Sequence, residues 1–145
     1  MSTRTATVTW TGRRVAFDAE SGTGHGVRLD DGDPFGDDTG LRPTEALLAA
    51  LGGCTGVNAV LLLQKYGQRF RTLEVRVEGD QAEVWPKAFT AIRITFLIGW
   101  EAGFDPDPEK VRRALDDSCE RYCPVHATLS AGVPIAHRYQ IAPGD

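Results

Sequence analysis

The feature that most constrains the fold is a long apolar stretch interrupted by glycines. Residues 43–66 read PTEALLAALGGCTGVNAVLLLQKY, and this length and composition predict one long helix. Gly52, Gly53 and Gly56 each cost such a helix about 1 kcal/mol relative to alanine. Because glycine lets another backbone approach closely, we expect tertiary or subunit packing to bury this helix and to offset that cost.

A membrane-spanning helix is the alternative interpretation of the same stretch. Residues 46–63 are nearly long enough, and their Gly-x-x-x-Gly spacing is typical of helix dimers in membranes. Three glycines, Thr55, Asn58 and the polar remainder of the chain argue against it. The polar residues 1–7 lack the apolar run of a signal peptide. We therefore expect a cytoplasmic protein with no membrane partner.

Alternating apolar residues predict several strands around this helix. Residues 6–17 predict two short strands in a hairpin, while residues 73–78 and 92–98 predict two further strands joined by a hairpin near residues 80–87. A last strand is expected over residues 135–141. The acidic run at residues 30–38 is interpreted as a solvated loop, because it lacks the twelfth-position Glu of a calcium loop.

A second and a third helix follow these strands. Asp107 and Pro108 predict a helix start, with Asp107 as the N-cap, and the residue before Pro124 predicts its end at Cys123. A short third helix is expected from Pro124 to Ser130. The pattern predicts an α+β fold with mostly antiparallel strands, in a single domain covering residues 1–145.

Composition narrows the classes of partner. The 145 residues carry a net charge of -4, and the chain has no basic footprint of the kind that binds phosphate backbones. Nucleic acid is therefore not an expected partner. The apolar content of 41% and charged content of 25% are those of an ordinary globular protein.

Three cysteines are the main candidates for chemistry. Cys54 lies within the apolar helix, where a small buried hydrophobe is the simplest interpretation. Cys123 is predicted to cap the short third helix, whose positive end favours a thiolate. Cys119 is interpreted as core packing. A zinc site formed by these cysteines and His126 is an alternative, although no Cys-x-x-Cys pair supports it.

Two segments together resemble one known family. The run PTEALLAALGGCT at residues 43–55 and the run RYCPVHATL at residues 121–129 match, in order and in separation, the signatures of the OsmC/Ohr family. The resemblance extends over nearly the whole chain and is closer to the general OsmC-like branch than to the strict organic-hydroperoxide-resistance branch. It implies an OsmC-like fold, with antiparallel sheets wrapped around a long central helix in an intertwined homodimer.

The resemblance also implies a function. Cys54 corresponds to a peroxidatic cysteine and Cys123 to a resolving one, in a thiol-dependent peroxidase that reduces organic hydroperoxides in oxidative-stress defence. Such an enzyme needs no cofactor or metal, and its partners are the hydroperoxide and a reducing dithiol, for instance of the lipoyl type. The alternative is a non-catalytic dimer of the same fold that binds or senses a small molecule or lipid.

One position departs from the family pattern. In the hydroperoxide reductases of the family a Glu directly follows the proline at the helix start, whereas this chain has Thr44 there and Glu45 next. One residue turns an ideal helix by about 100°, which puts the role of Glu45 in doubt. Its family partner is an arginine from the N-terminal strands, and three residues are candidates: Arg13, Arg14 and Arg28.

Overall fold

The computed structural model describes residues 2–141. Its chain divides into two compact units, Met1–Leu47 and Leu48–Asp145, called the N-terminal and the C-terminal unit below. Each unit holds one sheet of three strands. The expected single domain over residues 1–145 stays a prediction.

The N-terminal unit is a three-stranded antiparallel sheet followed by a loop. Strands β1 (Ala6–Trp10), β2 (Phe17–Ser21) and β3 (Gly26–Leu29) lie in that order, with Val8 opposite Ala19. The hairpin expected within residues 6–17 is therefore wrong in its second half. Residues 11–16 form the connection, in which Arg14 adopts a positive φ of 45°, and Phe17 opens the next strand.

The loop after β3 is held together from inside by Asp30. Its carboxylate accepts hydrogen bonds from the backbone N–H of Asp31, at 2.8 Å, and from the hydroxyl of Thr39, at 2.6 Å. Hydrogen bonds to a charged carboxylate favour its ionised form, and the contact with Thr39 contributes most to lowering the pKa of Asp30 to about 2. Asp30 is buried, so the expectation of a fully solvated acidic loop is wrong at this residue.

The long helix forms as predicted. Helix α1 runs over Pro43–Lys65, and Glu45 accepts a hydrogen bond from the backbone N–H of Arg42 at 2.9 Å, which satisfies one free donor near the helix start. Of the residues described, this is the one helix long and apolar enough to cross a membrane. A core helix meets the same criteria.

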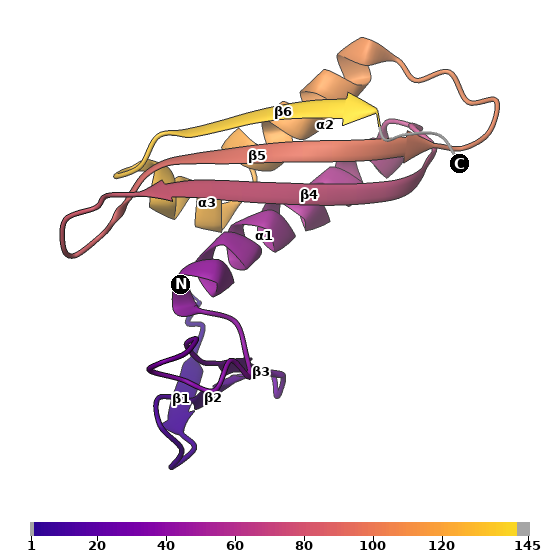
Figure 1. Ribbon diagram of the computed structural model, residues 1–145. Helices are drawn as coiled ribbons and strands as arrows, with labels where there is room; N and C mark the ends of the chain where they lie inside the picture. The colour runs from indigo at the N-terminus through magenta and orange to yellow at the C-terminus, as the bar shows by residue number, and fades with distance from the viewer. Residues whose placement is uncertain (1, 142–145) are drawn as a thin grey trace. The chain divides into compact units, whose positions relative to one another are not determined.

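The C-terminal unit packs helices against a sheet of mixed direction (Figure 1). Strands β4 (Phe70–Gln81) and β5 (Phe89–Trp100) form the predicted antiparallel hairpin, with Val75 opposite Phe96. Strand β6 (Ile135–Ile141) pairs with β5 in parallel, with Ile94 opposite His137. The α+β class is confirmed, and β6 is the departure from antiparallel pairing.

Two shorter helices complete this unit. Helix α2 spans Pro108–Glu120, and Asp107 caps it by accepting a hydrogen bond from Glu109 N–H at 3.0 Å. Its predicted end at Cys123 is wrong by one turn, because Arg121 is the C-cap. Helix α3 spans Pro124–Ser130 with Cys123 as its N-cap. Both predicted caps are confirmed.

The core of the C-terminal unit lies between its sheet and its helices. Alternate residues of β5 point inward, where they meet one face of α1 and one face of α2. The fully buried side chains come from all three elements and include Leu51, Ala59, Leu63, Ile92, Ile94, Phe96, Ile98, Val111 and Leu115.

Candidate active site

The glycines of α1 bring the helix close to β4. A Cβ built on Gly52 would lie 3.0 Å from Val77 Cγ2, and one built on Gly56 would lie 3.4 Å from Val75 Cγ2. The close approach expected of these glycines is therefore confirmed for two of them. A Cβ built on Gly53 in the same way would have no heavy atom within 4 Å. The Gly53 side of the helix is therefore open within the chain.

Cys54 lies two residues from each of these contacting glycines and is half-buried. The backbone carbonyl of Cys54 accepts a hydrogen bond from the Asn58 side-chain amide at 3.1 Å. Next to it, the fully buried Thr55 hydroxyl donates to the Leu51 carbonyl at 3.0 Å. The polar residues of this apolar helix are thus satisfied locally, and the Cys54 thiol is left at the boundary between core and surface.

Cys123 occupies the N-cap of α3. Its φ of -93° and ψ of 107° are extended, and its Sγ accepts a hydrogen bond from the backbone N–H of His126 at 3.3 Å. The side chain is only 3% exposed. Burial disfavours a thiolate and outweighs the helix end, so the pKa of Cys123 is raised and not lowered. The role of Cys123 in the site stays a prediction.

The fold brings Cys54 and Cys123 together from two separate helices. Burial first, and a hydrogen bond with the Cys54 side chain second, raise the pKa of Cys123 to about 11. Cys123 therefore keeps its proton at neutral pH. Both cysteines are free thiols, and they come from different elements and not from one regular helix, within which a disulfide would be strained.

Cys119 is a core residue, as predicted. It is fully buried on α2, and burial raises its pKa to about 12. Among residues 2–141 there is no group of three or more His, Cys, Asp or Glu side chains arranged to hold a metal ion. The cysteines and His126 of the zinc alternative do not form such a group.

Two histidines make interactions that the sequence did not predict. His137 Nε2 lies 2.7 Å from Asp116 Oδ1, joining β6 to α2. His126 is buried, and within residues 2–141 its Nε2 has no hydrogen-bond partner. Burial lowers the pKa of His126, and the nearby His137 lowers it further. A single histidine three residues after a cysteine carries no sequence signal of this arrangement.

The arginine candidates all bind aspartates in the N-terminal unit. Arg13 and Arg14 both contact Asp37, each at 2.9 Å. Arg28 Nε contacts Asp18 Oδ1 at 2.5 Å. Glu45, as described, accepts from the backbone of Arg42. The geometry of the N-terminal unit therefore does not single out any of the three arginines as the partner of Glu45.

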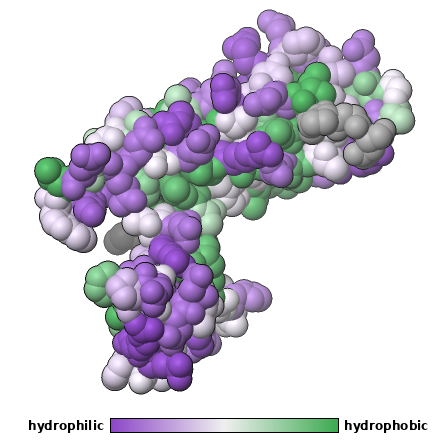
Figure 2. Space-filling view, in the orientation of Figure 1, coloured by the Kyte–Doolittle hydropathy of each residue, from purple (hydrophilic) through white to green (hydrophobic). Residues whose placement is uncertain are grey.

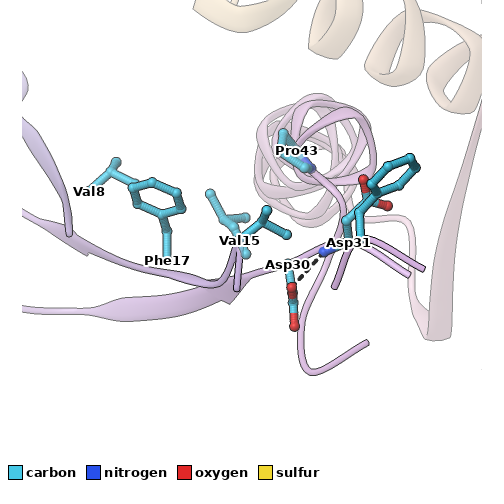
Figure 3. Close-up of a pocket in the computed structure, with 8 residues that line it drawn as sticks. Val8, Val15, Phe17, Asp30, Asp31 and Pro43 are labelled. Atoms are coloured by element: carbon cyan, nitrogen blue, oxygen red, sulfur yellow. Dashed lines mark hydrogen bonds between the residues drawn. The ribbon is translucent and has the colours of Figure 1, made fainter. Parts of the chain in front are cut away.

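An apolar pocket of about 460 Å³ lies within the N-terminal unit (Figure 3). The labelled side chains of Val8, Val15 and Phe17 rise from the sheet and its connection, and Pro43 closes one side from the start of α1. Asp30 and Asp31 are the acidic residues of the lining. Sequence analysis missed this pocket because its residues come from four separate segments. Its full lining is Val8, Val15, Phe17, Leu29, Asp30, Asp31, Phe35 and Pro43.

Comparison with known proteins agrees with this fold. The family model described as OsmC-like protein matches residues 36–138. Protein YhfA of Escherichia coli strain K12 is 34% identical over 127 residues, which cover 88% of this chain and 90% of YhfA.

Solved structures extend the comparison to more distant proteins. An OsmC-like protein from Mycoplasma pneumoniae has a TM-score of 0.82 at 18% identity, over 98% of this chain and 99% of its own. The organic hydroperoxide resistance protein OhrB of Bacillus subtilis has a TM-score of 0.62 at 17% identity, over 96% and 98% of the two chains. These two likenesses concern the fold. The family model and the YhfA match together show that this chain belongs to the OsmC family.

Proposed function

We propose that this protein is a thiol-dependent peroxidase that reduces organic hydroperoxides through Cys54 and Cys123. The observation that carries the proposal is the contact between a half-buried thiol on α1 and a buried, protonated thiol at the cap of α3. Membership of the OsmC family, whose fold is shared with a protein named for organic hydroperoxide resistance, supports the same reaction class.

The first step would oxidise Cys54. Its thiolate attacks the terminal oxygen of the hydroperoxide, a sulfur–oxygen bond forms and the oxygen–oxygen bond breaks. The leaving alkoxide takes up a proton to give the alcohol, and Cys54 becomes a sulfenic acid. Cys123, which keeps its proton at neutral pH, is not the competing nucleophile in this step.

The second step would join the two sulfurs. Cys123 attacks the sulfenic sulfur of Cys54, the sulfur–oxygen bond breaks, and hydroxide leaves with the Cys123 proton as water. A reducing dithiol, for example a lipoyl-type one, then restores both thiols by exchange.

The active form is proposed to be a homodimer in the cytoplasm. One side of α1 carries apolar residues that its own chain leaves uncovered, among them Val57 and Leu61, with the open Gly53 on the same side by helical spacing. A second copy packing there would bury this surface. An apolar face beside Cys54 also suits the alkyl tail of an organic hydroperoxide.

Substitution of each cysteine tests the proposal. Cys54→Ser is expected to abolish reduction of cumene hydroperoxide, and Cys119→Ala, which changes a core thiol outside the pair, is expected to keep it. Intact mass and free-thiol counts before and after one equivalent of peroxide, with peptide mapping, should give a Cys54–Cys123 disulfide in the wild type. Undiminished turnover in Cys54→Ser would reject the proposal.

A binding protein is the second candidate, and the apolar pocket of the N-terminal unit favours it. In that case the cysteines would not be needed for ligand binding. A Cys54→Ala, Cys123→Ala double variant that binds a lipid or other apolar ligand as tightly as the wild type, in a protein without peroxidase activity, would favour this function over the first.

A further inference from the structure

The β4–β5 hairpin ends in an exposed tryptophan. Val84 and Trp85 are 75% and 82% exposed, whereas a tryptophan normally buries most of its surface. The turn that carries them is well held, since Lys87 N–H donates to Val84 O at 2.8 Å and Ala82 N–H donates to Ala88 O at 2.9 Å. The indole is therefore presented on a rigid projection, visible as the long loop at one end of the sheet in Figure 1.

A cation accompanies this tryptophan. Lys87 Nζ lies over the indole ring, 4.6 Å from its centroid, an arrangement in which the ring face attracts the charge. The tip therefore combines apolar bulk with one positive charge. In the space-filling view, hydrophobic surface appears at this end of the sheet among hydrophilic neighbours (Figure 2).

The pocket of the N-terminal unit has the opposite character. Its lining is apolar except for Asp30 and Asp31, at one side in Figure 3. Phe35, on the same lining, is 68% exposed. Of the five aspartates between residues 30 and 38, Asp37 is paired with Arg13 and Arg14, and Asp38 is paired with Arg42. Asp31 is exposed; its Oδ1 accepts a hydrogen bond from Gly32 N–H at 2.7 Å and lies 3.9 Å from Arg42 Nε.

We propose that the hairpin tip of a second copy of this chain enters this pocket, with the Trp85 indole against Val8, Phe17 and Phe35 and with Lys87 near Asp31. The inference rests on the proposed homodimer and names one of its contacts. Apolar bulk meets an apolar pocket, and a lysine meets an acidic edge, so the two surfaces are complementary in apolar character and in charge. In a twofold dimer each chain would both give and receive one tip.

Photo-crosslinking tests this contact directly. Trp85→p-benzoylphenylalanine is irradiated in a mixture of isotope-labelled and unlabelled chains, and the crosslinked peptides are mapped by mass spectrometry. We expect mixed-isotope dimers joined from residue 85 to residues 8–43. The control, Arg112→p-benzoylphenylalanine, places the same probe on the exposed surface of α2 and should give no crosslink to those residues. Crosslinks within one chain, crosslinks to other residues, or monomers alone would each overturn the inference.

A charge swap provides an independent measurement. Lys87→Glu should weaken the dimer roughly tenfold or more in sedimentation analysis, because it places like charges together, and the Lys87→Glu, Asp31→Lys double variant should recover most of that loss. Equal dissociation constants for all three proteins would overturn the inference. Peroxide-driven disulfide formation, measured on the same samples, reports separately on the proposed function, so the two can fail independently.

Discussion

The C-terminal unit buries its own apolar side chains, whereas the N-terminal unit leaves most of its own exposed. Phe96 and the isoleucines of β5 are fully buried, while every residue of β1 is exposed. The apolar residues of the N-terminal sheet and its loop line a pocket instead. Among the described residues, the apolar core cluster therefore belongs to the C-terminal unit, whereas the N-terminal unit leaves apolar side chains available to another surface.

The largest effect is expected from removing a core side chain. Phe96→Ala should lower the free energy of unfolding by about 3–5 kcal/mol, because it leaves a cavity in the core of the C-terminal unit. Phe35→Ala, at a position that its own chain leaves exposed, should change it by about 0.5 kcal/mol or less when the protein is dilute enough to be monomeric. Urea unfolding followed by circular dichroism measures both. A loss at Phe35 that grows with protein concentration is expected if the pocket is covered in the dimer, and a large loss in the monomer would contradict its exposed position.

The next largest effect on stability is expected from replacing the adjacent glycines Gly52 and Gly53 of α1 by alanine. In the monomer, Gly53→Ala should stabilise α1 by about 1 kcal/mol through helix propensity, since nothing in its own chain lies within 4 Å of the added Cβ. Gly52→Ala places its Cβ 3.0 Å from Val77 Cγ2, and the crowding should leave it about 1–3 kcal/mol less stable than Gly53→Ala. Thermal unfolding of the two variants at a low protein concentration checks the ranking. The reverse ranking in the monomer would contradict the contact of Gly52 with β4, whereas a gain at Gly53 that disappears as the concentration rises would place a partner chain on the open side of α1.

The smallest effect is expected from protonation of Asp30 at acidic pH, and it is local to the loop that Asp30 holds together. The pKa of Asp30 is about 2 in the folded chain and about 3.9 in an unfolded one, so its contribution to stability is present above pH 4 and is lost as the pH falls toward 2. An NMR titration of the Asp31 and Thr39 amide protons, which donate to Asp30, should show a transition near pH 2. A transition near pH 4 would contradict the buried hydrogen-bonded carboxylate.

Sequence reasoning succeeded where local chemistry decides the structure. The Asp-Pro and Cys-Pro pairs predict both helix caps because the cap and the proline act within one turn. The β4–β5 hairpin also follows from alternation over neighbouring residues. These features form from contacts that are close in the sequence.

The same reasoning failed where distant segments meet. The alternation of apolar and polar residues identifies β6 as a strand. Because this alternation is the same for parallel and antiparallel pairing, the direction of β6 beside β5 could not be predicted. The pKa of Cys123 depends on burial among other elements, and the helix cap alone predicts the opposite shift. The pair Cys54 and Cys123 came from the family resemblance, since the two are 69 positions apart in the sequence and no local pattern links them.

The parallel strand β6 also sets an order of events during synthesis. Strand β5 pairs over Ile92–Ile98 with residues 135–141, which leave the ribosome only after both α2 and α3 have been made. Until then one edge of the most apolar strand in the chain has free backbone donors and acceptors, and such an edge is a template for pairing with other chains. The nascent protein therefore passes through a stage in which this edge of β5 is unpaired, and truncation before residue 135 would make that stage permanent.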